Sequence, residues 1–189
     1  MTSQDAAAVV AAYDFVPYRT VVDVGGGHGA LTDAILQSSP ASTVLIFDQA
    51  SVVEGARRRP RIASVAERCT FVSGNFFEAV PPGGDAYVLK DIIHDWDDER
   101  ATTILENCHR AMALVSTRNA SRLLIIEKVI PPGNTPFAGK LTDITMLLIA
   151  GGRERTAEEY QALLTGAGFR LTKIVPTRSP ASVIEGVAV

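Results

Sequence analysis

The sequence predicts an α/β fold in which a doubly wound, mostly parallel sheet carries helices on both faces. Short apolar runs alternate with stretches of helical periodicity, a pattern typical of parallel strands joined by right-handed helical crossovers. The first apolar run, residues 20–24, breaks into a glycine turn, residues 25–29, and an amphipathic stretch follows it. Strand, glycine turn and helix in that order form the first unit of nucleotide-binding folds. With 189 residues, of which 47% are hydrophobic, the chain has the size of one domain.

Each element is expected from its periodicity and its boundary residues. An Ala-rich helix is expected at Asp5–Tyr13, and a longer helix with one apolar face at Asp98–Val115. A third helix is expected at about Gly139–Ala150, followed by a loop of sequence GGRERT. The last helix begins with a capping box, Thr156 with Glu159, and ends at the second glycine of GAGF. Seven strands are expected, at residues 20–24, 43–47, 69–73, 86–90, 122–128, 169–175 and 182–189.

Composition and charge argue against several function classes. The net charge of −3 provides no general attraction to nucleic acid or to an anionic membrane surface. The longest apolar run, Ile144–Ala150, is too short to span a bilayer, and the first apolar residues have no basic flank typical of a signal peptide. Cys69 and Cys108 lack the spacing of a zinc site and are typical of small buried hydrophobes in a reducing compartment. We therefore expect a cytoplasmic protein whose partner is a small molecule rather than nucleic acid or membrane.

The glycine turn fits two classes of nucleotide cofactor. Residues 25–30 match the GxGxxG/A pattern of dinucleotide-binding proteins. The segment also matches a pattern of S-adenosylmethionine enzymes, in which Gly29 is the third glycine and Asp23 precedes the turn, where an acid suits the positive groups of that ligand. In either case Asp48, at the end of the second strand, can accept hydrogen bonds from both hydroxyls of a ribose. The turn alone indicates an adenosine-containing cofactor and leaves methyl donor and nicotinamide open.

Later motifs place further polar and aromatic side chains at the strand ends. GNFFE, residues 74–78, follows the third strand, and LKDIIHDWDDE, residues 89–99, contains the end of the fourth. Because ligands of open parallel sheets bind outside the carboxyl ends of the strands, we expect a single crevice there. Phe76 or Trp96 is expected to stack on an adenine, although a place in the hydrophobic core explains Trp96 equally well. The expected contributors to the crevice are Gly27, Asp48, Asn75, Lys90 to His94 and Glu127.

Together these motifs resemble the class I S-adenosylmethionine-dependent methyltransferases. Within that class they resemble the small-molecule O-methyltransferases of plants and bacteria that act on phenolic and polyketide hydroxyls. The resemblance implies a Rossmann-like sheet of seven strands, the last of them antiparallel, and S-adenosyl-L-methionine as the methyl donor. Several ordered motifs are more specific than one glycine turn. The similarity covers nearly the whole chain and includes VVDVGGGHG, FDQASVVEGA, GNFFE, LKDIIHDWDDE, LLIIEKVIP, DITMLLIAGGRERTAEEY and GAGF.

The resemblance implies a catalytic histidine at His94 and two flanking acids at Glu127 and Glu154. A neutral phenol is a poor nucleophile, so a base that removes its proton during attack accelerates the transfer, and histidine has a suitable pKa. A carboxylate beside the histidine fixes its tautomer and stabilises the imidazolium. The alternatives are a histidine with only local hydrogen bonds, a salt bridge between Glu127 and Lys128, and a solvated loop acid at Glu154.

The ligand contacts are carried over from the same resemblance. Met146 and Asp143 match a helix that lines the acceptor pocket. Asn75 stands where the family usually has an acid, which removes one charge, but its carbonyl can still accept from the adenine amino group. No metal is expected, because helix capping explains the acids of residues 95–99 and the family resembled is metal-independent. The expected donor contacts are Asp23, Gly25, Gly27, Gly29, Asp48, Asn75, Phe76, Lys90 and Trp96.

The family normally carries an additional N-terminal helical domain that dimerises and closes over the acceptor. Residues 1–189 are therefore expected to form a catalytic domain without that dimerisation domain, and so to lack much of the acceptor pocket. Three functions remain open. The first is an O-methyltransferase acting on a small aromatic hydroxyl, and the second is a donor-binding domain that is inactive without the N-terminal part. The third, a nicotinamide-dependent oxidoreductase, is favoured only by the glycine turn.

Overall fold

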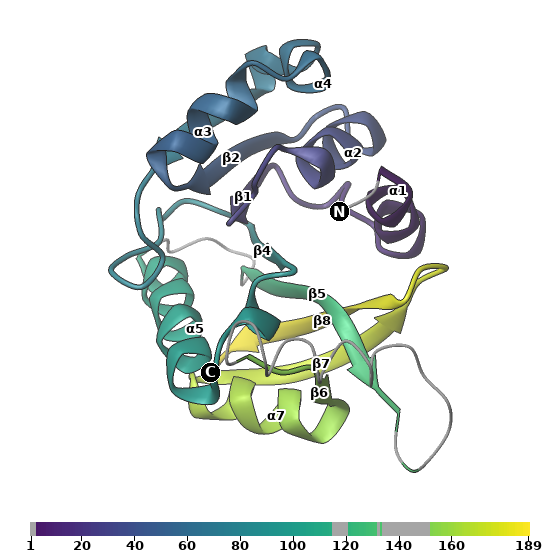
Figure 1. Ribbon diagram of the computed structural model, residues 1–189, viewed down its shortest axis with the longest axis vertical. Coiled ribbons are helices and arrows are strands. Elements are labelled where there is room, and N and C mark those ends of the chain that lie inside the picture. The colour runs from purple at the N-terminus through teal and green to yellow at the C-terminus, as the bar shows by residue number, and fades with distance from the viewer. Residues whose placement is uncertain (1–2, 115–120, 132, 134–151) are drawn as a thin grey trace.

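A mixed β-sheet runs through the middle of the molecule, and helices pack on both of its faces (Figure 1). The computed structural model describes residues 3–114, 121–131, 133 and 152–189. The described strands are β1 (Thr20–Val24), β2 (Thr43–Asp48), β3 (Cys69–Ser73), β4 (Ala86–Lys90), β5 (Arg122–Ile130), β6 (Arg155–Thr156), β7 (Phe169–Pro176) and β8 (Ala181–Ala188). The described helices are α1 (Ser3–Ala12), α2 (Ala30–Ser38), α3 (Ala50–Arg57), α4 (Pro60–Ala63), α5 (Asp98–Ala113) and α7 (Ala157–Gly166), with the 3-10 turns η1 (Ala66–Arg68) and η2 (Ile93–Asp95).

The strand order confirms the predicted doubly wound sheet. The order is β3-β2-β1-β4-β5-β8-β7, in which β1 to β5 pair in parallel and β8 is antiparallel to both of its neighbours. The chain moves outward from β1 through β2 to β3, and then returns to the other side of β1 with β4. The winding therefore reverses between β1 and β4, the place where open α/β sheets bind their ligands.

The predicted number of strands, seven, is wrong by one. The eighth strand, β6, has two residues and pairs in parallel with Val129 and Ile130 at the C-terminal end of β5. It lies in the GGRERT segment, which was expected to be a loop. A two-residue strand is too short to show alternating polarity, and it exists because β5 continues two residues beyond the predicted end at residue 128.

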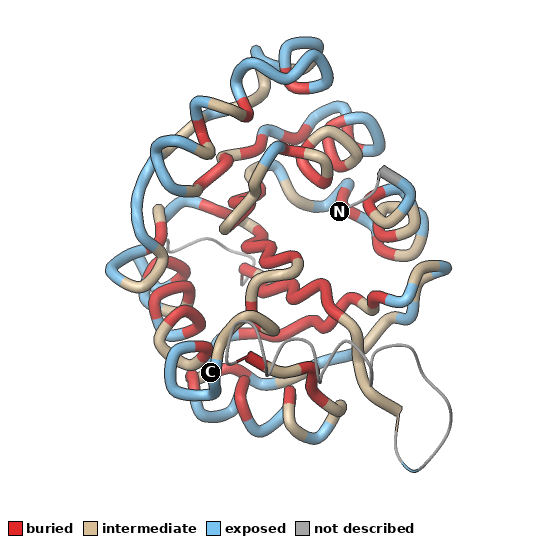
Figure 2. The backbone as a smooth tube through the Cα atoms, in the orientation of Figure 1, coloured by how far each residue is buried: buried red, intermediate tan, exposed pale blue. Residues whose placement is uncertain are grey.

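Each face of the sheet has its own hydrophobic core. Val22 and Leu89 pack with α5 and α7, whereas Val21 and Val88 pack with α1 and α2. Neighbouring strand residues point to opposite faces, so a strand such as β4 that is covered on both sides is buried along its whole length. Figure 2 shows this burial concentrated along the central strands, while the outer helices are buried only on one side.

The helix boundaries agree closely with the sequence pattern where the structure describes them. The capping box of α7 is present, with the Thr156 hydroxyl accepting from the Glu159 backbone N–H and the Glu159 carboxylate accepting from that of Thr156. Helix α5 ends at Ala113, and the helix expected at 139–150 lies outside the described residues. None of the helices in the described part of the chain is long and apolar enough to cross a membrane.

Leu105→Ala is expected to destabilise the fold by about 2–5 kcal/mol, because it leaves a cavity at a fully buried position of α5. Leu114→Ala, at the exposed end of the same helix, is the matched control and is expected to change the free energy of unfolding by less than about 0.5 kcal/mol. Urea unfolding of both variants measures the difference. Equal losses would contradict the assignment of this face of α5 to the core.

Candidate active site

The glycine turn after β1 lies against the segment that follows β4. Gly25 has a φ of 69° and donates its N–H to the carbonyl of Phe47, 2.8 Å away. A Cβ at position 25 would lie 2.3 Å from Cδ1 of Ile92. The positive φ favours glycine, and a larger residue would also force the Ile92 side chain to move. The turn is therefore shaped by contacts with β2 on one side and with the β4 end on the other.

Asp48 fixes the glycine turn from the end of β2. Its Oδ2 accepts from the Gly27 backbone N–H at 2.9 Å, and its Oδ1 accepts from that of Gln49 at 2.7 Å. An ionised carboxylate has about four acceptor sites, so two of them remain for ribose hydroxyls. Asp48 lies at the end of β2 as predicted, its contact with a ribose stays a prediction, and its hydrogen bond to the glycine turn is not foreseen from the sequence.

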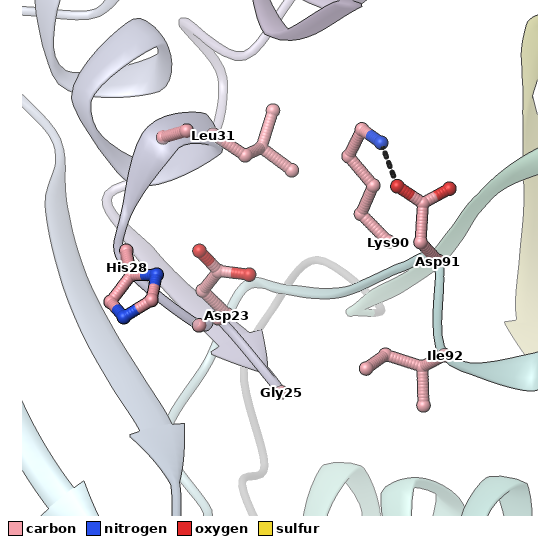
Figure 3. Close-up of a pocket in the computed structure, with 10 residues that line it drawn as sticks. Asp23, Gly25, His28, Leu31, Lys90, Asp91 and Ile92 are labelled. Carbon is pink, nitrogen blue, oxygen red and sulfur yellow. Dashed lines mark hydrogen bonds and ion pairs between the residues drawn. The ribbon is translucent and has the colours of Figure 1, made fainter. Parts of the chain in front are cut away.

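A cavity of about 300 Å³, which we call the glycine cavity, opens between the β1 and β4 ends. Figure 3 shows two groups of lining residues. The segment from β1 to α2 contributes Asp23, His28 and Leu31, and the end of β4 with the residues after it contributes Lys90, Asp91 and Ile92. Gly29, expected to line the donor, is not among its lining residues. It instead begins α2 in a left-handed conformation and packs against Ile62. The lining residues are Asp23, Gly25, Gly26, Gly27, His28, Ala30, Leu31, Lys90, Asp91 and Ile92.

The glycine cavity contains a buried acid. Asp23 accepts from the Thr32 hydroxyl at 2.6 Å, and burial raises the pKa of its carboxyl to about 6 although that hydrogen bond lowers it. Across the cavity the ammonium of Lys90 is buried and forms an ion pair with Asp91. Asp91 has a φ of 54°, an uncommon conformation for a residue other than glycine and one that occurs often at functional sites.

A second cavity, the aromatic cavity of about 320 Å³, lies beyond Asp48. The Trp96 and Phe77 rings meet edge to face with centroids 4.8 Å apart, and Phe76 packs against both. The Asn75 side chain bonds within its own turn, accepting from the Phe77 backbone N–H at 3.0 Å and donating to Glu78 at 3.1 Å. The lining residues are Asp48, Gln49, Gly74, Asn75, Phe76, Phe77 and Trp96.

Two buried carboxylates lie close to the same ring nitrogen of His94. Its Nδ1 lies 3.1 Å from Glu127 Oε2 and 3.8 Å from Glu154 Oε1, and its Nε2 lies 3.3 Å from Asp95 Oδ1. The other oxygen of Glu127 accepts from the backbone N–H groups of Ile92, Ile93 and His94 at 2.7–3.2 Å. We call residues 92–96 the histidine turn. The sequence-predicted trio of His94, Glu127 and Glu154 is therefore brought together.

The charges around His94 favour its protonated form. Burial lowers the pKa of the imidazole, but the hydrogen bond with Glu127 and the charges of Glu127, Asp95 and Glu154 outweigh it and raise the pKa to about 9. Burial also raises the pKa of Glu154, against the neighbouring ammonium of Lys128 at 3.0 Å. Lys128 thus pairs with Glu154 and not with Glu127, which was the alternative considered from the sequence.

His94, Glu127 and Glu154 also offer ligand atoms within 4.8 Å of one another, a spacing at which a metal ion can be held. However, one oxygen of Glu127 serves three backbone N–H groups and Glu154 bonds Lys128. The expectation that no metal binds here stays a prediction.

His94 faces a third cavity, the histidine cavity of about 350 Å³, which shares Lys90 and Asp91 with the glycine cavity. A molecule in one cavity can therefore lie next to a molecule in the other. Asp143 and Met146, expected to bind the acceptor, lie outside the described residues. Asp91 falls within the expected crevice segment 90–94, but its positive φ and its ion pair with Lys90 are not marked by any sequence motif. The lining residues are Asp5, Lys90, Asp91, His94, Lys128, Pro180 and Ala181.

Comparison with known proteins identifies the family. The model of the O-methyltransferase domain matches residues 2–170. The chain belongs to this family. It is 46% identical over 184 residues to the phenazine O-methyltransferase of Lysobacter antibioticus, covering 97% of this chain and 52% of that protein. It is 40% identical over 182 residues to the O-demethylpuromycin-O-methyltransferase of Streptomyces alboniger, covering 94% and 47%. The chain thus spans about half the length of these curated relatives.

Solved structures show the same fold in members of this family. Human N-acetylserotonin methyltransferase in complex with S-adenosylmethionine matches with a TM-score of 0.85 at 28% identity, over 97% of this chain and 51% of that one. An O-methyltransferase from neocarzinostatin biosynthesis, in complex with S-adenosylmethionine and 2-hydroxy-5-methyl naphthoic acid, matches with a TM-score of 0.83 at 32% identity, over 95% and 52%. These matches confirm the expected Rossmann-like methyltransferase fold.

Glu127→Gln is expected to move the His94 pKa from about 9 toward 6.5. Glutamine keeps one oxygen for the three backbone N–H groups, and it replaces the charged oxygen that faces Nδ1 with a neutral NH2, which removes both the charge and the acceptor that hold the proton. NMR titration of the imidazole signals of the three histidines measures the shift. Glu106→Gln, an exposed acid of α5, is the control and is expected to leave the His94 pKa unchanged.

The same ion pair couples stability to pH. The folded-state pKa of about 9 lies above the ordinary value of 6.5, so the contribution of His94 is complete below pH 6.5 and is lost as pH rises through 9. Denaturant unfolding of the wild type between these pH values is expected to show a loss that Glu127→Gln greatly reduces. A loss of the same size in both proteins would contradict the assignment.

Proposed function

We propose that this chain is an S-adenosylmethionine-dependent O-methyltransferase that methylates a hydroxyl of a small aromatic acceptor. The observation that carries the proposal is the place of His94, held by Glu127 and facing a cavity that adjoins the glycine cavity. Family membership supports the reaction type, and the relatives named above support an aromatic acceptor. We propose further that residues 1–189 form one catalytic domain, and that dimerisation uses a domain outside it.

The residues of the glycine and aromatic cavities fit the methyl donor. Asp23 is buried at a raised pKa, so its carboxylate gains from a cationic group placed beside it. Gly25 and Gly27 offer close approach of the backbone, Asp48 has acceptor capacity for the ribose, and Phe76 offers an aromatic surface for adenine. When bound, the donor supplies an electrophilic methyl group on a sulfonium.

His94 is the proposed general base. Glu127 keeps a proton on Nδ1, so Nε2, which lies 3.3 Å from Asp95 Oδ1 in this structure, is the nitrogen that accepts the proton of the acceptor hydroxyl. In the unliganded protein the pKa of about 9 means that the imidazole is mostly protonated at neutral pH. The rate is therefore expected to increase with pH up to about 9. Asp143 and Met146 remain proposed acceptor contacts.

The first test compares ligands and variants. Calorimetric titration with S-adenosylhomocysteine is expected to show saturable binding, and titration with NAD none. In assays with a panel of phenols, His94→Ala is expected to reduce kcat by about 10²–10⁴-fold with little change in donor affinity. His109→Gln is the control, because His109 packs on Phe169 and lines none of the three cavities.

Each outcome has a distinct meaning. Wild-type turnover in His94→Ala would remove His94 from its proposed role. Saturable donor binding without turnover by the wild type would support the donor-binding domain, inactive by itself. Binding of NAD in place of S-adenosylhomocysteine would support the nicotinamide-dependent oxidoreductase.

The second test concerns Asp23. S-Adenosylhomocysteine has an ammonium group, and Asp23 must be ionised to attract it. Affinity is therefore expected to decrease as pH falls through about 6, by up to about tenfold per pH unit. Asp23→Asn is expected to bind more weakly at pH 7.5 and to lose most of this dependence, whereas Asp33→Asn, whose side chain bonds Gln37 on the solvent side of α2, is expected to behave as the wild type. A wild-type pH profile in Asp23→Asn would contradict the role of this acid.

A further inference from the structure

The histidine turn is held from both sides of its backbone. Glu127 accepts from N–H groups at its start, and a second side chain, Arg155, donates to its carbonyl oxygens. The guanidinium Nη1 lies 3.1 Å from the carbonyl oxygen of Ile93, and Nη2 lies 2.9 Å from that of Trp96. These two carbonyls flank His94 along the chain. The N–H and C=O groups of one short turn are therefore bonded by two oppositely charged side chains.

The guanidinium of Arg155 is completely buried, which is rare for arginine. Its charge is balanced by Asp98 at the start of α5, whose Oδ1 accepts from Nε at 3.1 Å and from Nη2 at 2.9 Å. Asp98 is itself exposed, so only the guanidinium side of this pair is buried, and such pairs commonly add little net stability. An apolar residue at position 155 would therefore lose the hydrogen-bond geometry of the guanidinium and little net stability.

The backbone around Arg155 also presses on the histidine turn. A Cβ at Gly152 would lie 2.0 Å from the carbonyl oxygen of His94 and 2.5 Å from the carbonyl carbon of Asp95. No side chain fits in that space, so residues 152–155 lie directly against the turn. From this segment Glu154 reaches Nδ1 of His94 and Arg155 reaches the carbonyls.

We propose that Arg155 is a positioning residue for His94: its guanidinium fixes the backbone of the histidine turn and so holds the imidazole between Glu127 and the histidine cavity. The inference rests on the proposed function only in taking His94 as the base. Only a planar fork suits this task, because the acceptors on Ile93, Trp96 and Asp98 lie in different directions. Lysine has three donors on one nitrogen and cannot reproduce the four hydrogen bonds that the guanidinium makes to these residues.

Arg155→Lys keeps the charge and removes the fork. It is expected to reduce kcat by about 10²-fold, as for a misplaced catalytic group, while the KM for the donor changes less than about twofold. Arg153→Lys is the matched control, because the Arg153 side chain bonds the same Asp98 but makes no hydrogen bond to the histidine turn. It is expected to retain the wild-type kcat.

The ionisation of His94 separates positioning from a general loss of stability. The charged groups facing His94 are Glu127 from β5, Asp95 from its own turn and Glu154 from the segment 152–155, with Lys128 beside Glu154. If the turn shifts, the contact with Glu127 lengthens and the His94 pKa falls. Neutralising a nearby cation without movement, as in Arg155→Gln, would instead raise that pKa. A fall in both Arg155 variants, followed by NMR titration, is therefore the expected result.

Asp98→Asn is a second variant in case the Arg155 variants do not fold. It leaves the guanidinium of Arg155 in place and weakens the ion pair that holds it. We therefore expect a smaller decrease in kcat and a smaller fall of the His94 pKa than in the Arg155 variants. A folded Arg155→Lys, or failing that Asp98→Asn, with wild-type kcat and an unchanged His94 titration would overturn the proposal. The NMR readout needs no turnover. A fall of the His94 pKa in a protein without methyl transfer would uphold the positioning role and refute only the proposed function.

Discussion

The site depends on one buried carboxylate, that of Glu127. Burying an ionised carboxylate is costly unless it is paired and fully hydrogen-bonded. Glu127 is completely buried; one of its oxygens accepts from three backbone N–H groups, and the other is paired with the His94 imidazole 3.1 Å away without a further hydrogen-bond donor among the described residues. Because Glu127 lies on β5 and its partners follow β4, one side chain joins two neighbouring strand ends and sets the direction of the histidine.

Around this carboxylate, acids and bases from different elements are paired. Lys128 bonds Glu154, Lys90 pairs with Asp91, and Arg155 pairs with Asp98. Each pair links segments or strengthens a turn at the carboxyl edge of the sheet. Asp23 differs in accepting from a hydroxyl, and burial raises its pKa to about 6. The glycine cavity therefore contains a group suited to a cationic ligand, while the histidine cavity contains one suited to holding a proton.

Much of the fold could be predicted because the signals are local. The strands β1, β3 and β4 have their predicted bounds, since each is an apolar run between turn-forming residues. The capping box of α7 needs only Thr156 and Glu159 at the right spacing. Strand β6 could not be predicted, because two residues are too few to show an alternating pattern and their pairing depends on how far β5 extends. Sequence spacing cannot distinguish a glycine that lines a cavity from one that lies against Ile62, so the expected contact of Gly29 with the donor stays a prediction.

The sequence by itself determined the class of fold, the strand ends that carry polar residues, and His94, Glu127 and Glu154 as one group. The strand ends follow because parallel strands bring their carboxyl ends to one edge, whereas the grouping of the three side chains was implied by the resemblance of the motifs to a known family. Only the tertiary structure decided which oxygen holds the backbone and which faces the imidazole, that Lys128 pairs with Glu154, and that Arg155 bonds the histidine turn. All of these contacts depend on burial, and some join segments more than thirty residues apart along the chain. A periodic sequence pattern contains information on neither burial nor such distances.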